Sequence, residues 1–188
     1  MVGYAFAYGA TLTLSGSHAT GNVTWTGTNV GGLIGYGHAD NSNNSSTINI
    51  TNSYHNTGDV QGANNVGGLL GLAVGNAGYS YVAAKSAAIN ISGSYAAGNV
   101  AGRSMVGGLV GYAYAYAHDA SSYGGDATIA IANSRATGNV NASSDYVGGL
   151  IGRIYARASN SPATVSVSGS YSTGAVSGAN YAGGLVGY

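Results

Sequence analysis

The chain has 188 residues, only 5% of them charged, and a formal net charge of zero, which argues against nucleic acids and anionic membranes as partners because both need a basic face. The lack of Cys excludes disulfides, thiolate catalysis and Cys-based metal sites, and no apolar run approaches the roughly 20 residues of a membrane span. The 34 Gly and single Pro, together with β-branched and aromatic residues that alternate with small ones, favour strands and turns over helices.

The chain begins partway through a glycine-rich motif that recurs along its whole length. Val2-Gly3-Tyr4 matches the end of the later segment Val106–Tyr112, and the core of the motif reads Gly-Gly-Leu-x-Gly. Its complete copies are Gly31–Gly35, Gly67–Gly71, Gly107–Gly111, Gly148–Gly152 and Gly183–Gly187. Such self-similarity is typical of repeat architectures, in which each unit stacks on its neighbours.

Two further blocks follow each copy of the motif. The first alternates apolar and polar residues, which predicts a strand with one buried face. Its copies are Thr11–His18, Thr47–Tyr54, Ala88–Tyr95, Thr128–Arg135 and Thr164–Tyr171. The second block, a Gly two residues before a Val, occurs at Gly21–Val23, Gly58–Val60, Gly98–Val100, Gly138–Val140 and Gly174–Val176. Each unit is therefore predicted to contain three short strands separated by turns.

A single unit has too few apolar residues to enclose a core, but stacked units would align them into ladders. One such column would contain Leu33, Leu69, Leu109, Leu150 and Leu185, at about 4.8 Å per rung. The sequence predicts an all-β fold, a β-solenoid (β-helix) of about five stacked rungs that forms one array over residues 1–188. The predicted units are 1–30, 31–66, 67–106, 107–147 and 148–182, with 183–188 the start of a further unit.

The turn after the Thr-Ile strand holds only Gly or Asn at one position. These two residues best tolerate a left-handed backbone, so the alternation predicts a recurring turn with positive φ. The predicted turn column is Gly16, Asn52, Gly93, Asn133 and Gly169. A Ser follows each of them and is placed to hydrogen-bond the turn backbone.

Unit length varies only between the Gly-Gly-Leu strand and the following Thr-Ile strand. Several of these inserts alternate small and aromatic residues, so the first strand is predicted to continue and to return as a hairpin-like flap with its rings on one face. The rings would pack along the stack or form an adhesive surface for a glycan or a partner chain. The candidate interaction residues are Tyr4, Phe6, Tyr8, Tyr79, Tyr81, Tyr112, Tyr114, Tyr116 and Tyr155.

The segments Asn29–Tyr36 and Val106–Tyr112, followed by Ser-Tyr and Gly-Asn-Val, resemble the GLUG motif, which is named after its Gly-Leu-x-Gly core. The resemblance covers essentially the whole chain. The departures from it are Leu72 and Arg153 for Tyr, Ala182 for Val and Arg135 for the Ser-Tyr aromatic. GLUG repeats occur in large bacterial surface and secreted proteins, including adhesins and some IgA-specific metalloproteases, as a stalk or β-helical module. The resemblance implies extracellular display and supplies no catalytic residues.

Residues with catalytic or metal-binding chemistry are sparse. The histidines, which lack metal-ligand spacing, are His18, His38, His55 and His118. Asp59 replaces the Asn of other units and is interpreted as a turn variant. Asp119 and Asp126 flank one insert and would support glycoside hydrolysis only if they approached each other. The Gly-rich motif lacks the Lys-Ser/Thr of a phosphate-binding loop, and we predict no catalytic residue, metal or cofactor.

We therefore expect a non-catalytic structural and adhesive module of a bacterial extracellular or cell-surface protein. Both ends of the chain fall in the same phase of the repeat without a polar cap, which predicts a continuing array and end-to-end or lateral self-association. One alternative is ice binding through Thr columns, and another is a glycan-binding module. The Thr columns are Thr11, Thr47, Thr128 and Thr164, broken by Ala88, and Thr20, Thr57, Thr137 and Thr173, broken by Ala97.

Overall fold

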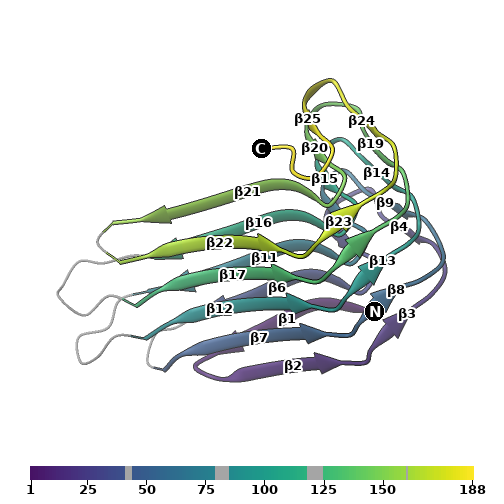
Figure 1. Cartoon of the computed structure of the whole chain (residues 1–188). Coiled ribbons are helices and arrows are strands. Elements are labelled where there is room, and N and C mark those ends of the chain that lie inside the picture. Colours follow the sequence, from purple (N-terminus) through teal and green to yellow (C-terminus); the bar gives the residue numbers. More distant parts are fainter. Residues whose placement is uncertain (41–43, 79–84, 118–124, 160) are drawn as a thin grey trace.

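Parallel strands stacked along one axis form the chain. The computed structural model describes residues 1–40, 44–78, 85–117, 125–159 and 161–188, and within these it contains strands but no helix. Each strand pairs in parallel with the equivalent strands of the neighbouring coils (Figure 1). The fold is thus a β-solenoid, and the predicted all-β stack is confirmed. No helix of the described part is long and apolar enough to cross a membrane.

Five five-stranded sheets run along the stack. Sheet A contains β1 (Val2–Tyr8), β6 (Ile34–Asp40), β11 (Leu70–Ala77), β16 (Val110–Ala117) and β21 (Ile151–Ala158). Sheet B contains β2 (Thr11–Ser15), β7 (Ser46–Thr51), β12 (Ala87–Ser92), β17 (Ala127–Ala132) and β22 (Ala163–Ser168). Sheet C contains β3 (His18–Ala19), β8 (Tyr54–His55), β13 (Tyr95–Ala96), β18 (Arg135–Ala136) and β23 (Tyr171–Ser172).

The other two sheets lie between sheet C and the next strand of sheet A along the chain. Sheet D contains β4 (Val23–Thr24), β9 (Val60–Gln61), β14 (Val100–Gly102), β19 (Val140–Ala142) and β24 (Val176–Ser177). Sheet E contains β5 (Thr28–Gly31), β10 (Asn64–Gly67), β15 (Ser104–Gly107), β20 (Asp145–Gly148) and β25 (Asn180–Gly183). Every coil passes through the sheets in the order A, B, C, D, E.

The prediction of three strands per unit is wrong, because each coil contributes a strand to all five sheets. The chain bends at the Gly-Gly pair, so β5 ends at Gly31 and β6 begins at Ile34. The left-handed turn at Gly16 likewise separates β2 from the two-residue β3. The predicted number of rungs is close, since five strands per sheet correspond to about four turns between β1 and β21.

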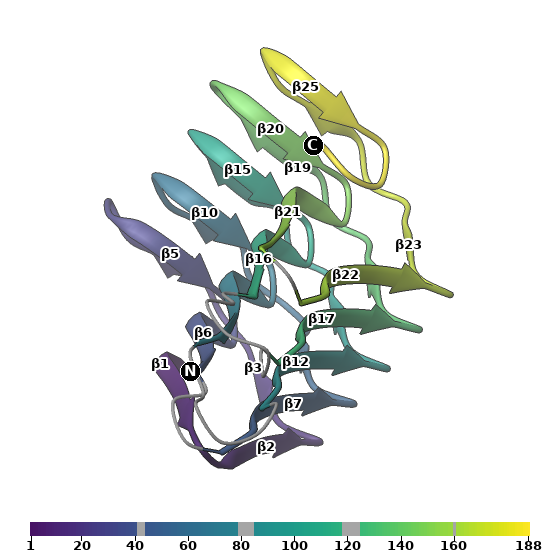
Figure 2. The same cartoon turned by 90° about the vertical axis from the view of Figure 1, so that its left-hand side faces the viewer.

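The coil is L-shaped in cross-section. Sheets A and B face each other across a slab, and sheets D and E form an arm that projects from one end of it (Figure 2). Sheet C occupies the outer corner, where sheet B leads into sheet D. The inner corner is the junction at which sheet E leads back into sheet A.

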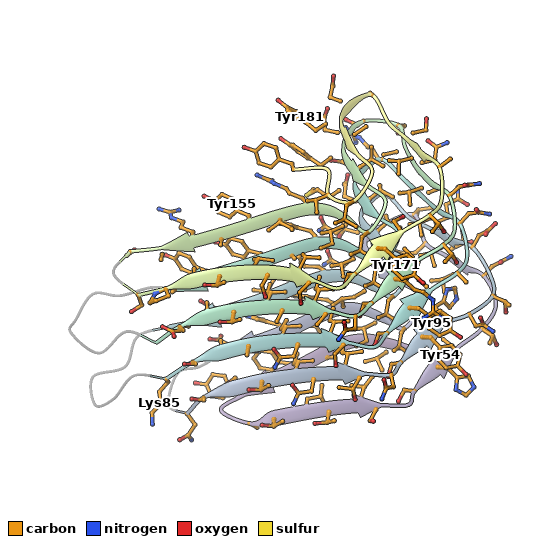
Figure 3. The ribbon with its side chains drawn as sticks, viewed as in Figure 1. Tyr54, Lys85, Tyr95, Tyr155, Tyr171 and Tyr181 are labelled. Atoms are coloured by element: carbon orange, nitrogen blue, oxygen red, sulfur yellow. The ribbon has the colours of Figure 1, made fainter. Side chains whose placement is uncertain are left out.

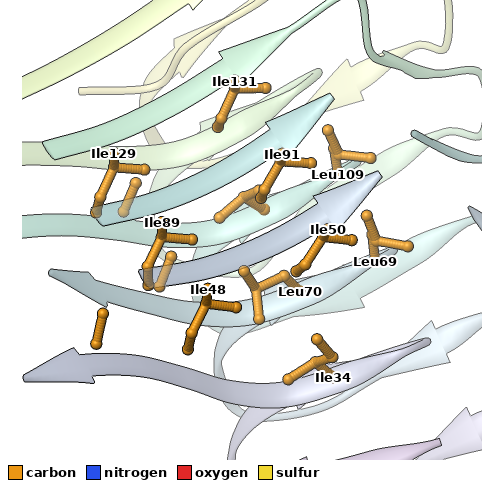
Figure 4. Packing of buried hydrophobic residues seen from close by; sticks show 14 of the residues in the cluster. Ile34, Ile48, Ile50, Leu69, Leu70, Ile89, Ile91, Leu109, Ile129 and Ile131 are labelled. Carbon is orange, nitrogen blue, oxygen red and sulfur yellow. The ribbon is translucent and has the colours of Figure 1, made fainter. Parts of the chain in front are cut away.

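Each part of the L has its own hydrophobic core. Between sheets A and B, Ile48, Ile50 and Ile34 are fully buried, and the equivalent residues of the next coils stack on them (Figure 4). Between sheets D and E, Val60 and Val66 belong to a smaller, separate cluster of valines. Burial of each large aliphatic side chain contributes about 1.5–3 kcal/mol, so these columns are the main source of stability.

The predicted hairpin-like flap is wrong for the described residues. The long strands of sheet A do continue into the inserts, but the strand that returns lies in sheet B and pairs only with its own neighbours there. Small and aromatic residues alternate because Ala73 and Ala113 face the core, where they let the two sheets approach closely. The rings therefore point outward from the slab.

The repeated glycines are positions of close backbone contact. A Cβ atom on Gly107 would lie 2.1 Å from the Val110 carbonyl oxygen, and one on Gly108 would lie 2.2 Å from the Gly149 carbonyl oxygen. Neither distance leaves room for a side chain. The motif thus sets the bend between sheets E and A rather than a phosphate-binding loop.

A ladder of buried hydrogen bonds runs along the corner between sheets B and C. The five residues of the turn column have φ between +48° and +57°, and a Ser follows each. Each Ser Oγ donates to the carbonyl oxygen two residues earlier, at 2.8–3.3 Å. Except in the first coil, the Ser Oγ also accepts the backbone N–H of the Ser one coil earlier, at 3.1–3.2 Å. Stacking therefore satisfies the turn backbone.

Candidate interaction surface

The outward face of sheet A holds most of the aromatic rings. Strand register places them in three columns that run along the stack. The column next to the inner corner contains Tyr4, Tyr36, Leu72, Tyr112 and Arg153. The middle column contains Phe6, His38, Val74, Tyr114 and Tyr155. The outer column contains Tyr8, Asp40, Asn76, Tyr116 and Arg157.

Most of the aromatic residues predicted from the sequence lie together on this face. Those of the first coil and Tyr155 are exposed, with Tyr4 at 54%, whereas Tyr112, Tyr114 and Tyr116 are half-buried. The predicted residues Tyr79 and Tyr81 lie outside the described residues. Reasoning from the sequence missed Tyr36, His38 and Arg153, although their place one strand-length after the Gly-Gly pair could have identified them.

The rings contact one another both along and across the strands. Tyr114 and Tyr116 have ring centroids 6.1 Å apart along β16, and Tyr114 and Tyr155 lie 5.6 Å apart across coils. Tyr4 and Tyr36 lie 5.0 Å apart at the other end of the face. Aromatic pairs at such distances contribute about 0.5–1.5 kcal/mol each. The rings thus pack on each other in two groups, one on β1 and β6 and one on β16 and β21, and Leu72, Val74 and Asn76 of β11 separate the groups.

The wall of the inner corner is a second column with positive φ, which the sequence did not reveal. Its members are Asn29, Asn65, Met105, Tyr146 and Tyr181, with φ between +50° and +62°. Asn is common in this conformation, whereas a Met or Tyr costs about 1–2 kcal/mol there. The bend at the Gly-Gly pair imposes the conformation whichever residue is present, so composition alone gives a weak signal.

The outward face of sheet A forms the floor of the inner corner. Arg153 lies where this floor meets the wall, among four tyrosines. Its guanidinium carbon is 4.9 Å from the ring centroid of Tyr146 and 5.3 Å from that of Tyr112. The rings of Tyr188 and Tyr155 lie at 5.4 Å and 5.7 Å. Such cation–π contacts contribute about 0.5–2 kcal/mol, so Arg153 retains the aromatic packing although it departs from the motif Tyr. Its buried Nε has no hydrogen-bond acceptor among the described residues.

Partial burial on this face shifts the pKa of several side chains. Burial raises the pKa of the Tyr36, Tyr112 and Tyr114 hydroxyls above the usual value. Burial also lowers the pKa of the His38 imidazole, and the nearby Asp40 carboxylate opposes that shift only in part. Desolvation disfavours the charged form of each group, so the cause is the same in all four. The floor is therefore suited to apolar and neutral polar ligands.

The outward face of sheet B has a different chemistry. Its side chains are small and uncharged, and they also lie in three columns. The first column is Thr11, Thr47, Ala88, Thr128 and Thr164. The others are Thr13, Asn49, Asn90, Ala130 and Ser166, and Ser15, Thr51, Ser92, Ala132 and Ser168. The second predicted Thr column, which contains Thr20, lies beyond sheet C at the outer corner and is exposed.

A stack of flat side chains follows the outer corner. Tyr54 and Tyr95 lie 4.8 Å apart and nearly parallel (Figure 3). The His18 ring stacks on Tyr54 at 5.1 Å, and the Arg135 guanidinium lies 4.3 Å from the ring centroid of Tyr95. The Arg therefore extends this stack, although it departs from the Ser-Tyr motif. These rings point away from the inner corner and provide a matched comparison for it.

Two further residues with titratable side chains, His55 and Asp59, make hydrogen bonds that stabilise the fold. His55 is fully buried, and its Nε2 lies 3.0 Å from the Gly21 carbonyl oxygen. Asp59 Oδ1 accepts the backbone N–H of Asn99 at 3.0 Å, within a ladder of side-chain acceptors along this turn. His118 and Asp119 lie outside the described residues, so their proximity to Asp126 is not defined. Among the described residues, no three His, Asp or Glu side chains cluster as a metal site would require.

Comparisons of the chain with protein-family models, with curated proteins and with solved structures gave no match in any of the three.

Proposed function

We propose that the chain is a non-catalytic structural and adhesive module whose contact surface is the inner corner. The single observation that carries the proposal is the gathering of tyrosines from successive coils on the concave side of the L. Large ring faces and edges on a partly buried floor favour contact with another surface. Because the columns continue from coil to coil, longer arrays would present proportionally more of this surface.

The chemistry of the inner corner suits a glycan or an uncharged solid. Tyr rings offer apolar contact to the C–H faces of sugars, and their hydroxyls add hydrogen bonds. The only charged residues among the three columns of the floor are Asp40, Arg153 and Arg157. The floor thus offers few ionic contacts and many aromatic ones.

The structural part of the proposal depends on the hydrogen-bond ladders. Backbone pairing, the Ser ladder and the side-chain acceptors at Asn22, Asp59, Asn99 and Asn139 all run parallel to the stack. Every coil is therefore joined to the next through five sheets and two further ladders. Such an array resists bending, which is the mechanical property that a stalk requires.

The first coil of the structure supports self-association. Leu12 and Leu14 are only partly buried, whereas Ile48 and Ile50 one coil later are fully buried. At the same end, a cavity of about 420 Å³ opens beside Val23 and the exposed Trp25. A further coil, from this chain or from another copy, would cover this surface and pair the open strand edges. Lateral contact through the inner corner is the other route.

The GLUG resemblance supports display on a bacterial surface or in the extracellular space. Stalk modules in such proteins hold other domains away from the cell, and a stiff array of coils would serve the same purpose here. The inner corner would then add adhesion along the length of the stalk.

Retention on solid carbohydrate tests the adhesive role. Purified chain would be incubated with insoluble cellulose, with chitin and with polystyrene beads, and the bound fraction measured. We expect retention on at least one of these, and strongly reduced retention for the double variant Tyr114→Ser, Tyr155→Ser. The matched control is Tyr54→Ser, Tyr95→Ser, which removes a stacked pair from the outer corner. The absence of retention, or equal losses in both variants, would contradict the proposal.

Light scattering and electron microscopy test the self-association. We expect the mean mass to rise with protein concentration and short rods to become visible. Leu12→Lys would place a charge on the open end and lower the mass. Strictly monomeric behaviour of the folded chain at high concentration would eliminate this part of the proposal without affecting the adhesive part.

A further inference from the structure

The outward face of sheet B has features that neither the stalk nor the adhesive inner corner uses. It lies on the side of the slab away from sheets D and E (Figure 2). None of its three columns contains a charged or aromatic residue, and no side chain in them is larger than Asn. Sheet A of the same slab carries rings at the equivalent positions, so the scaffold itself does not require small residues.

The side chains of this face form a regular two-dimensional array. Neighbouring strands of a sheet lie about 4.8 Å apart, and alternate residues along a strand are about 6.7 Å apart. The four pairings that build sheet B keep one register over the whole face, with Thr11 opposite Thr47 and Thr128 opposite Thr164. Both spacings are fixed by the backbone, so the face presents its hydroxyl and methyl groups at regular intervals in two directions. An extended lattice is the ligand geometry that such an array fits.

The array is also rigid. The opposite side of each strand is anchored in the core by a pair of β-branched or Leu side chains, such as Ile89 and Ile91, which are buried. Thr side chains have few accessible rotamers, so their hydroxyl and methyl groups are fixed relative to the backbone. The single side-chain hydrogen bond within these columns in the described structure joins Asn90 to Asn49, at 3.0 Å. The hydroxyls therefore remain available to water.

We infer that the outward face of sheet B binds ice. The ligand is the crystalline water surface, recognised by rows of hydroxyl and methyl groups that hold hydration water in lattice positions. Charged groups would orient water radially and disrupt this order, which is consistent with their absence from the three columns. This activity uses a different face from the proposed adhesive corner and does not depend on it.

Thermal hysteresis, ice-crystal shaping and partition of the chain into growing ice test this inference. We expect the wild-type chain to show all three. Ala130→Arg places a long cation in the middle column of the face and should abolish them. Val74→Arg makes a comparable change in the middle column of sheet A and should leave them intact. Circular dichroism would establish that both variants retain the fold.

A gain-of-function pair sharpens the test. Ala88→Thr completes the Thr column of sheet B and should raise the hysteresis at equal protein concentration. Ala97→Thr completes the other Thr column, at the outer corner, and should not. A folded wild-type chain without hysteresis or partition would overturn the inference, as would equal effects of the two Arg variants. The cellulose and polystyrene assays report on the inner corner alone, so the two proposals can fail separately.

Discussion

Replacement of Ser94 by Ala should lower the free energy of unfolding by about 2 kcal/mol, because one buried unpaired donor costs about 1–3 kcal/mol. Ser94 Oγ accepts the backbone N–H of Ser53 at 3.1 Å and donates to the Ser92 carbonyl oxygen at 3.0 Å. Ser53 and Ser94 are both fully buried, so water cannot take the place of the lost oxygen. The change in volume is a single atom, and the cavity adds little.

Urea denaturation followed by circular dichroism would measure the effect. Ser166→Ala is the control, because that hydroxyl is exposed on sheet B and makes no hydrogen bond to the protein in the described structure. Surface substitutions of this kind usually change stability by less than about 0.5 kcal/mol. If Ser94→Ala were as mild as Ser166→Ala, the Ser ladder would not be satisfying the turn backbone. The reasoning about coil-to-coil cohesion would then be refuted.

Three other substitutions test the backbone and the inner corner. Gly108→Ala should prevent stable folding, because the added Cβ would lie 2.2 Å from a backbone oxygen. Gly37→Ala should instead stabilise the chain by about 0.5–1 kcal/mol, because the nearest neighbour of its Cβ is a Leu70 methyl at 3.5 Å. Equal melting temperatures of the two variants would contradict this. Met105→Asn should stabilise by about 1–2 kcal/mol in urea, because it suits the left-handed conformation and can donate to the unpaired Asn65 Oδ1, whereas Met105→Leu should not. His38→Phe should flatten the pH dependence of the free energy of unfolding. Burial lowers the pKa of His38 in the folded chain, so the neutral imidazole contributes its full stability above the unfolded pKa of about 6.5. That stability is lost as the pH falls from there towards the folded pKa. Unchanged pH profiles of the melting temperature would reject that assignment.

The repeat columns were predictable because stacking places identical positions beside each other. Leu33 and Leu69 pack in the same core because they occupy equivalent positions in successive copies of the motif. The Gly or Asn turn column was predictable for a similar reason, since a side chain that tolerates positive φ is recognisable by type. Period-two alternation also identified the long strands of sheet A. In each case the residue type at a repeated position indicates its local environment.

The path of the chain between the columns was not predictable. Alternating small and aromatic residues fit a hairpin and a stacked parallel strand equally well, and only the core on the far side distinguishes them. The bend at Gly31 depends both on its own unit, where a Cβ would meet the Ile34 carbonyl oxygen, and on the neighbouring coil, where it would lie 2.7 Å from Gly71 N, so the motif alone does not define the path of the chain. The left-handed positions of Met105 and Tyr146 are imposed by that bend against their own preference.

Departures from the repeat at outward positions indicate which surface properties the chain retains, because packing restricts the inward positions but not these. At Arg153 and Arg135 a guanidinium replaces a ring yet still lies against the neighbouring rings, so the aromatic stack survives the change. Ala88 and Ala130 interrupt polar columns on sheet B without introducing bulk or charge. Outside β11, whose Leu72, Val74 and Asn76 interrupt the rings of sheet A, outward substitutions keep one physical property while residue type varies: stacking at the inner and outer corners, flatness on sheet B. Ring contacts between neighbouring coils explain the first property. No contact in the described structure requires the second, which is the property that the proposed binding of ice would use.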